Sequence, residues 1–320
     1  MTAAGWIEIA LYLAILTAIT APLGAYMARV YGGATRPLER RLHRALGVRG
    51  QGQGWKAYAR SALVFSVVSW AMLYLILRTQ GLHPFNPAGL SSTTWDNAFN
   101  VASSFVTNTN WQYYGGETTL SYFSQMAGLA VQNFASAAVG MAVVIAFIRG
   151  IVARSGRSLG NFWVDLIRSL LYVLLPLSVL AGLFLVSQGV VQTLSGGPGA
   201  IAVGPVGSQE AIKLLGTNGG GFFNVNSAHP FENPRWLTNF VELLLILAIP
   251  AGLTATYGRM VGNRRQGWMV YGVMAGLLLV AVVVVALAES GPTPAMHAAG
   301  IVGDNLEGKE QRFGIASTAL

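Results

Sequence analysis

Long apolar stretches alternate with polar connections along the chain. A helix needs roughly 18 to 20 apolar residues to cross a hydrocarbon core about 30 Å thick, and six stretches approach or exceed that length. The pattern predicts six membrane-spanning helices and an all-α integral membrane fold. The predicted spans are residues 6–27, 62–77, 126–148, 170–187, 241–257 and 268–288.

The first stretch is interpreted as a retained span and not as a cleavable signal peptide. No Lys or Arg precedes it, and Arg29 follows it directly. A signal peptide has a basic start and a shorter apolar core. We therefore expect residues 1–30 to form an additional N-terminal membrane helix.

Two connections, residues 79–122 and 188–238, are long, and they follow one plan. In the first, residues 95–106 are predicted to form a short helix that begins with a capping box of Thr93 and Asp96. A polar loop of Thr and Asn residues follows this helix. The next apolar span begins after the loop.

The second long connection repeats this order. Residues 209–215 are predicted to form a short helix with Ser208 as its N-cap and with Glu210 in its first turn, where the helix dipole favours an acidic side chain. The glycine-rich loop GTNGGG follows it. Each unit therefore has the order span, short helix, loop and span.

The repeat predicts how the chain is organised. After the sixth span the plan begins again with NLEGKEQRFGIASTAL. The expected parts are an N-terminal helix (1–30), a basic loop (31–60), a first pore unit (61–148), a second basic loop (149–168), a second pore unit (169–257) and the start of a third, incomplete unit (258–320).

Composition supports a membrane protein. Hydrophobic residues make up 53% of the 320 residues and charged residues only 10%, and the mean hydropathy is +0.52, which is unlike soluble domains. The absence of cysteine excludes disulfides, thiolate metal sites and cysteine nucleophiles.

The net charge of +8 is explained by topology. Lys and Arg cluster in alternate connections, with eight residues from Arg29 to Arg60, four from Arg149 to Arg168, and three at Arg259, Arg264 and Arg265. Basic connections stay on the cytoplasmic side, so the N-terminus is predicted to lie outside. A nucleic-acid surface would need these residues gathered on one folded face, and no nucleic-acid partner is expected.

The two polar loops are candidates for a cation site. Non-helical backbone at membrane depth is tolerated only where it is buried in protein or lines a water-filled cavity, and the C-terminal end of a re-entrant helix carries partial negative charge. Glycine and asparagine adopt positive φ most readily, so successive carbonyls can face one ion. Neither loop contains a charged residue, which favours a monovalent cation.

An ordinary alternative stays open for these loops. Gly, Asn and Thr are also typical of turns on the solvent side of a membrane protein. The short helix before each loop and the repetition of the arrangement favour re-entrant loops.

Several blocks of the sequence together resemble a known family. They are VTNTNWQ, GETTLSYFSQMAGLAVQNFASAA, SQEAIKLLGTNGGGFFNVNSAHPFENP, RRQG and NLEGKEQRFG. They are similar to the KdpA family, the potassium-binding, channel-like subunits of the bacterial Kdp-type potassium-transporting ATPases. The resemblance extends from the first span to the last residues.

This resemblance implies a fold of four units around a pseudo-fourfold axis, as in potassium channels and transporters, plus an extra N-terminal helix. Each unit contributes one filter loop, and the third and fourth units of the longer family chains come after residue 320. The implied first filter strand is Thr107, Asn108, Thr109 and Asn110, with Gln112 just beyond it. The implied second strand is Gly216, Thr217, Asn218, Gly219, Gly220 and Gly221.

The resemblance also implies partners and a location. The potassium ion is the transported species, and ATP is hydrolysed by a P-type ATPase subunit that receives the ion sideways. Two small accessory subunits complete the complex, which lies among the lipids of the bacterial inner membrane. The chain itself has no DKTGT phosphorylation motif, and in GDNLEGKE the residue Glu310 replaces the hydroxyl of a nucleotide-binding loop, so no nucleotide is expected to bind.

Other polar residues have two interpretations. Gln125, Gln132 and Asn133 recur on the third span, where they either face a pore or hold helices together. The four histidines lack a second ligand at metal spacing. A non-conducting scaffold that anchors a partner ATPase stays the alternative function, whereas a membrane enzyme would need paired acid and base groups that are not visible.

Overall fold

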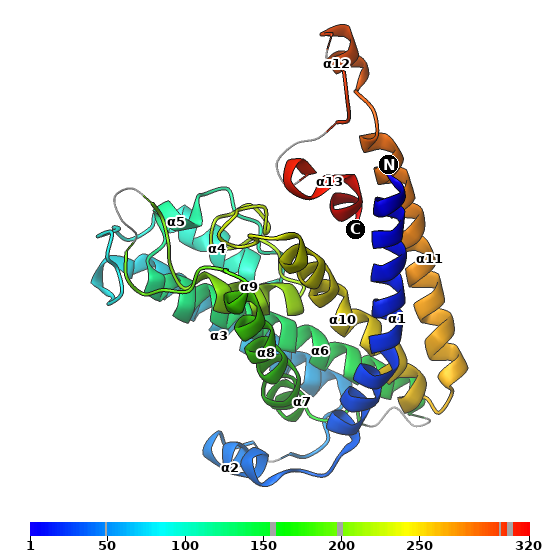
Figure 1. Ribbon diagram of the computed structural model, residues 1–320. Helices are drawn as coiled ribbons and strands as arrows, with labels where there is room; N and C mark the ends of the chain where they lie inside the picture. The colour runs from blue at the N-terminus through cyan, green and yellow to red at the C-terminus, as the bar shows by residue number, and fades with distance from the viewer. Residues whose placement is uncertain (49, 154–157, 197–200, 301, 306–309) are drawn as a thin grey trace. The chain divides into compact units, whose positions relative to one another are not determined.

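The computed structural model describes residues 1–48, 50–153, 158–196, 201–300, 302–305 and 310–320, and every regular element in these residues is helical (Figure 1). The α-helices are α1 (Ala3–Gly32), α2 (Pro37–Ala45), α3 (Trp55–Arg78), α4 (Trp95–Val106), α5 (Gly116–Thr119), α6 (Val131–Val152), α7 (Phe162–Arg168), α8 (Leu175–Ser187), α9 (Val206–Leu215), α10 (Trp236–Met260), α11 (Arg264–Glu289), α12 (Pro294–Ala298) and α13 (Glu310–Ala319). A short 3₁₀ turn, Gln80–Leu82, follows α3.

Six helices in the described residues are long and apolar enough to span a membrane, as predicted. Two of them contain a π-helical stretch that the apolar pattern does not reveal. Ser124–Ala130 leads into α6, and Ser169–Leu174 joins α7 to α8. The helices are longer than the apolar stretches because their hydrogen-bonding continues into polar end residues. For example, α3 begins at Trp55 and ends at Arg78.

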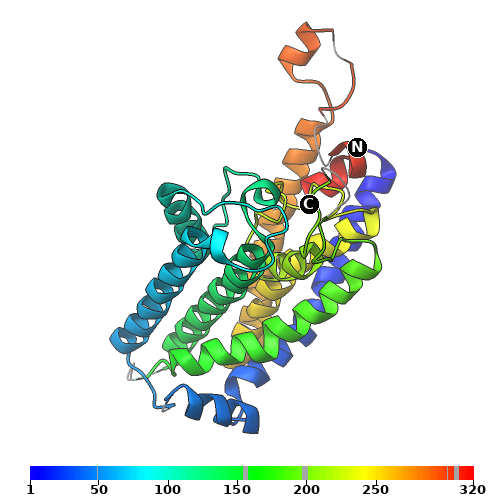
Figure 2. The same ribbon diagram turned by 90° about the vertical axis from the view of Figure 1, so that its left-hand side faces the viewer.

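The structure divides into two compact units, residues 26–234 and residues 1–25 with 235–320. In the first unit α6 contacts α3, α4, α7 and α9, and Figure 2 shows α3 and α6 running side by side. The short helix α4 packs on α3, and the short helix α9 packs on α8. Each short helix therefore lies against the long helix that precedes it in the chain.

The helix α4 runs back along α3. At its start, Arg78 donates a hydrogen bond to the carbonyl of Thr93, and further along α4 the indole Nε1 of Trp70 donates to Ser103 Oγ at 3.0 Å. Trp70 lies eight residues before Arg78, or about 12 Å along a helix. The C-terminal end of α4 therefore lies beside the middle of α3.

The predicted capping box of α4 is wrong by one residue. The N-cap is Thr94, and the hydroxyl of Thr93 instead donates to the carbonyl of Leu77 at 3.2 Å, near the end of α3. A hydrogen bond from the Thr94 side chain lowers the pKa of Asp96. The sequence pattern predicted the helix correctly, but it assigned the N-cap to Thr93, whose hydroxyl bonds to α3.

The predicted start of α9 is also wrong. The helix begins at Val206, so Ser208 is its third residue and Glu210 lies beyond the first turn. Gln192 Oε1 accepts a hydrogen bond from Ser208 N at 2.9 Å, which satisfies a backbone donor at the helix start. This distant partner allows the helix to begin before the residue that resembled a cap.

Two ion pairs with buried carboxylates lie at the other end of the long helices of this unit. Arg149, near the C-terminus of α6, binds both carboxylate oxygens of Asp165 at 2.6 and 2.9 Å, and Tyr58 donates to the same carboxylate at 3.0 Å. Arg168 binds Glu39 at 2.8 Å, and the Glu39 side chain is fully buried. Part of the basic charge predicted from the sequence is thus neutralised inside the fold.

In the second unit, α10 packs on α11, and both contact α13. Residues 3–25 of α1 hydrogen-bond to these helices: Tyr12 OH donates to the Leu243 carbonyl at 3.0 Å, and Thr17 contacts Tyr271 OH at 2.6 Å. Gly24 approaches α10 so closely that a Cβ there would lie 2.5 Å from the Gly252 carbonyl oxygen. The α13 helix is kinked at Gly314, while residues 306–309 of the GDNLEGKE segment are outside the described residues.

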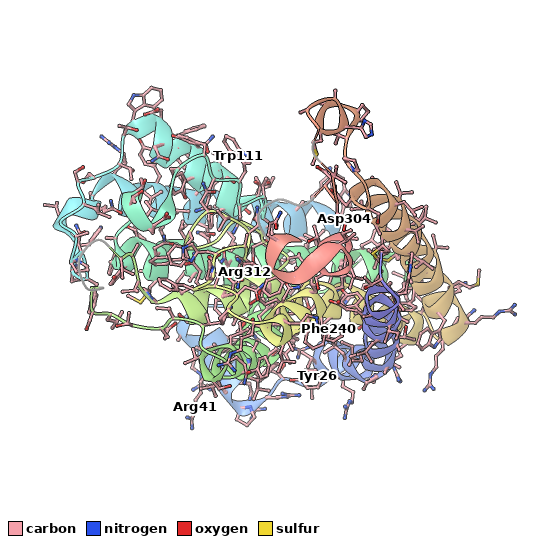
Figure 3. The ribbon with its side chains drawn as sticks, turned by 45° about the horizontal axis from the view of Figure 1, so that its top comes forward. Tyr26, Arg41, Trp111, Phe240, Asp304 and Arg312 are labelled. Carbon is pink, nitrogen blue, oxygen red and sulfur yellow. The ribbon has the colours of Figure 1, made fainter. Side chains whose placement is uncertain are left out.

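Replacing Asp165 with Ala is expected to destabilise the first unit by roughly 2 kcal/mol, because it removes a buried carboxylate that binds the guanidinium of Arg149, whose side chain is 22% exposed. The free energy of unfolding in detergent measures the effect. Arg41→Ala on the exposed face of α2 (Figure 3) is the control and should change it by less than about 0.5 kcal/mol. Equal effects of the two substitutions would contradict this assignment.

Gly24→Ala is expected to destabilise the second unit by roughly 1 to 3 kcal/mol, since the new methyl group overlaps the backbone of α10. Gly272→Ala is the matched control, because a Cβ at Gly272 in α11 meets nothing within 4 Å. Thermal unfolding of the two variants provides the comparison. A neutral Gly24→Ala variant would show that α1 and α10 are not in close contact.

Candidate functional site

The two loops predicted as filter strands meet within the compact unit formed by residues 26–234. The side-chain amide Nδ2 of Asn108 donates hydrogen bonds to the carbonyl oxygens of Gly216 and Thr217 at 3.2 and 3.3 Å. Gln112 Oε1 accepts a hydrogen bond from Gly221 N at 2.9 Å. Residues about 110 positions apart in the sequence are therefore joined directly at the C-terminal ends of α4 and α9.

Side chains of α6 hold both loops. Ser136 Oγ donates to Asn108 Oδ1 at 2.7 Å and accepts from Asn218 Nδ2 at 3.1 Å. Asn110 Nδ2 donates to Asn133 Oδ1 at 2.7 Å. We name these five residues, Asn108, Asn110, Asn133, Ser136 and Asn218, the amide cluster. It anchors the two loops to one face of one helix.

The amide cluster lies well inside the length of a membrane-spanning helix. The continuous helix to which α6 belongs runs from Ser124 to Val152. Asn133 lies about 14 Å from its start and Ser136 about 24 Å from its end, at 1.5 Å per residue. The loops are thus beside the middle of the helix and not beyond its end, where solvent-side turns would lie.

The loops contain a run of left-handed backbone conformations. Positive φ angles occur at Asn108 (61°) and Asn110 (54°) in the first loop, and at Gly219 (82°) and Gly220 (68°) in the second, as their residue types predicted. Thr217 also has a positive φ of 53°. A β-branched residue is strained there, at a cost of about 1 to 3 kcal/mol, and such strain is typical of functional sites.

Glycine is required at two positions because the backbone of one loop lies against its neighbours. A Cβ on Gly220 would lie 2.6 Å from the carbonyl oxygen of Asn110 and 2.6 Å from Gln112 Oε1. A Cβ on Gly221 would lie 2.5 Å from Glu232 Oε1. Both positions therefore exclude any larger residue without movement of the loops.

Several backbone carbonyl oxygens of the loops accept no hydrogen bond from any described residue. They belong to Thr107, Asn108, Thr109 and Asn110 in the first loop and to Asn218, Gly219 and Gly220 in the second. Several loop amides, in contrast, donate to carbonyls of the preceding helix, as Asn110 N does to the Ser104 carbonyl at 3.2 Å and Asn218 N to the Lys213 carbonyl at 2.9 Å. The unpaired oxygens are neutral ligands of the kind that suit a monovalent cation.

Exposure alternates along the two loops. Thr107 and Thr109 are exposed while Asn110 is buried, and Thr217 and Gly219 are exposed while Asn218 and Gly220 are buried. The buried members are held by the protein, and the exposed members face away from it. Within the residues described, no group of three or more His, Asp or Glu side chains could hold a metal ion.

Sequence reasoning missed the residues behind the loops. The pattern predicts that Asn133 faces a pore or makes packing hydrogen bonds, and its partner proves to be Asn110 of the first loop. Gln132 serves packing by donating to the Ser69 carbonyl at 3.1 Å. Lys213 and Glu232 are charged, buried and adjacent to the second loop, although neither lies within it. Glu210 and Lys213 are three residues apart on one helix, and this spacing could have predicted their ion pair.

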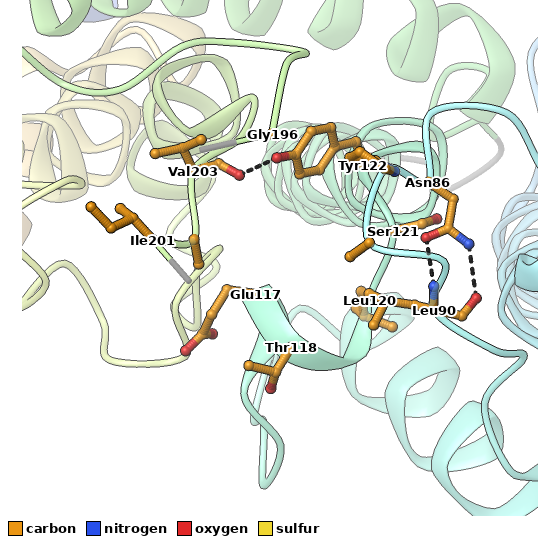
Figure 4. Close-up of a pocket in the computed structure, with 13 residues that line it drawn as sticks. Asn86, Leu90, Glu117, Thr118, Leu120, Ser121, Tyr122, Gly196, Ile201 and Val203 are labelled. Atoms are coloured by element: carbon orange, nitrogen blue, oxygen red, sulfur yellow. Dashed lines mark hydrogen bonds between the residues drawn. The ribbon is translucent and has the colours of Figure 1, made fainter. Parts of the chain in front are cut away.

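A separate pocket of about 410 Å³ lies between the two long connections (Figure 4). Tyr122 OH donates to the Val203 carbonyl at its edge, and the side chain of Asn86 pairs with the backbone of Leu90. Its lining residues lie in 86–90 and 117–122 and at Gly196 and 201–203, and none of them belongs to the two loops. The pocket is therefore distinct from the candidate ion site.

Known proteins of high similarity identify the family. Residues 10–320 match the model of the family described as potassium-transporting ATPase A subunit. The chain is 54% identical to a potassium-transporting ATPase potassium-binding subunit of Methylorubrum extorquens and 54% identical to one of Granulibacter bethesdensis. A third relative with the same description, from Sorangium cellulosum, is 52% identical.

The similarity covers all of this chain and part of each relative. The alignments include 100% of the chain but 59%, 60% and 61% of the three relatives. The chain thus spans about three fifths of their length. The matched region includes every block of residues that carried the resemblance, and the chain belongs to the family of potassium-transporting ATPase A subunits.

Proposed function

We propose that this chain binds potassium ions on the outer side of a bacterial inner membrane and passes them to a P-type ATPase partner for ATP-driven import. The observation that carries the proposal is the meeting of two loops with unpaired carbonyl oxygens beside the middle of α6. The relatives are named as potassium-binding subunits, which supports potassium as the ion.

The architecture fits a pair of re-entrant pore units. The helices α4 and α9 run back along α3 and α8 and end at the loops, so the partial negative charge of both helix C-termini is directed at one region. Cation entry from outside agrees with the orientation in which the basic connections are cytoplasmic. In this scheme Thr107–Asn110 and Gly216–Gly221 supply two filter strands.

Selection follows from the ligands. A potassium ion that leaves water must exchange its hydration shell for oxygen ligands, and fixed carbonyl dipoles supply them without a full negative charge. The amide cluster sets the distance between the two strands, because Asn108 of the first strand bonds to the second and Ser136 bonds to both. Further strands from the rest of a full-length subunit complete the shell in this proposal.

In this proposal the chain binds the ion, and a partner subunit supplies the energy for transport by hydrolysing ATP. No phosphorylation motif occurs in the sequence, so ATP hydrolysis belongs to the P-type subunit, and two small accessory subunits complete the complex. This division of roles leaves the chain without a nucleotide and without catalytic residues of its own.

Gly220→Asp is expected to raise the potassium concentration for half-maximal ATPase activity of the assembled complex at least tenfold and to weaken discrimination against rubidium and sodium. The carboxylate would enter the space of the Asn110 carbonyl and Gln112. Potassium-dependent ATP hydrolysis and ⁸⁶Rb uptake provide the two measurements.

Gly89→Asp is the matched control, since Gly89 also has a positive φ (62°) and lies in a long outward connection, yet a Cβ there meets nothing within 4 Å. It should leave potassium affinity unchanged. A non-conducting scaffold predicts the opposite result for Gly220→Asp, with assembly lost and the potassium dependence of the remaining complex unaltered.

A further inference from the structure

A buried cluster of charges lies behind the second loop. The ammonium Nζ of Lys213 is 2.6 Å from Glu210 Oε2 and donates to Ser227 Oγ at 2.8 Å. Ser227 in turn donates to Glu210 Oε1. All three side chains are at most 3% exposed, and Glu232 beside them is fully buried. We name Glu210, Lys213, Ser227 and Glu232 the lysine cluster.

The lysine cluster touches the backbone of the loop at Gly221. A Cβ on Gly221 would lie 2.5 Å from Glu232 Oε1 and 3.0 Å from Lys213 Nζ. Glu232 Oε1 also accepts a hydrogen bond from Phe223 N at 3.3 Å. On the opposite side, Gly221 N donates to Gln112 Oε1 of the first connection. Gly221 is therefore held between the lysine cluster and Gln112.

A contribution to folding stability does not by itself explain why charged residues are buried here. Removing charges from water costs several kcal/mol per ion, and a buried pair is often no more stable than apolar residues of similar volume. The cluster does fix geometry, since its hydrogen bonds and ion pair join α9, through Glu210 and Lys213, to the turn at Ser227. Glu232 holds the other side of the loop end by accepting a hydrogen bond from Phe223 N. Together they enclose the end of the loop.

We propose that Lys213 is a positioning residue that, through Glu210, Ser227 and Glu232, fixes Gly221 and so sets the ion affinity and selectivity of the second loop. The inference rests on the proposed function, because it assigns a role within the same ion site. Lys213 does not touch the ion. It acts on the loop backbone, and its loss widens the range of positions that the Gly220 and Gly221 peptides occupy.

The role of Lys213 can be tested with a variant that keeps the net charge of the lysine cluster. With the two glutamates ionised, the lysine cluster carries two negative charges and one positive charge. Lys213→Met alone leaves two carboxylates without a cation and can prevent folding. The double variant Lys213→Met/Glu210→Gln keeps the net charge of the cluster and removes the ammonium that joins its members.

For this double variant we expect the complex to assemble, while the potassium concentration for half-maximal ATPase activity rises about tenfold and the ratio of potassium to rubidium affinity falls toward one. Maximal ATPase activity should change much less than the half-saturating concentration. A merely structural cluster predicts an altered melting temperature with wild-type potassium affinity and selectivity, and that result would overturn the proposal.

The matched control is Arg149→Met/Asp165→Asn, which removes another ion pair with a buried carboxylate in the same unit. Arg149 lies thirteen residues beyond Ser136 on α6, or about 20 Å from the amide cluster, so potassium affinity should stay at the wild-type value. Gly220→Asp is measured in parallel. If Gly220→Asp shifts potassium affinity and the double variant does not, only the role of Lys213 is wrong; if neither does, the proposed function fails.

Discussion

One constraint governs the structure: where a helix is interrupted beside helices long enough to span a membrane, the backbone polar groups must find hydrogen-bond partners within the protein. Lipid offers no hydrogen-bond partner, so unwound segments must be held by protein. The amide cluster meets this need for two loops at once, because Asn108 bonds to the Gly216 and Thr217 carbonyls while Ser136 bonds to Asn108 and Asn218. The carbonyl oxygens that receive no such bond are the ones available to an ion.

The surrounding helices are placed so that both loops reach the amide cluster. The short helices α4 and α9 bring their C-terminal ends to the same face of α6, each supported by the long helix before it. The π-helical stretch Ser124–Ala130 precedes the face that carries Asn133 and Ser136, and such stretches are frequent at functional sites. The loops themselves contain no charged residue. The buried Lys213 lies behind the second loop, and the partly exposed Arg149 lies at the far end of α6.

The apolar pattern predicted the six long helices, and residue types predicted positive φ at Asn108 and Gly220, because both features are local. The helix starts were wrong where a distant partner intervened: Leu77 takes the hydroxyl of Thr93, and Gln192 satisfies the amide of Ser208. The contact of Asn133 with Asn110 also depends on residues far apart in the sequence. The orientation in the membrane and the division into pore units stay predictions, since the fold alone tests neither.

The most direct measurement is the position of a bound ion in a structure of the assembled complex with thallium, whose anomalous scattering distinguishes it from water. The account predicts an anomalous peak in direct contact with carbonyl oxygens of both loops, between residues 107–110 and 218–220. A bound ion elsewhere in the protein, with these two loops ordered and empty, would contradict the claim that their backbone oxygens replace the water around potassium.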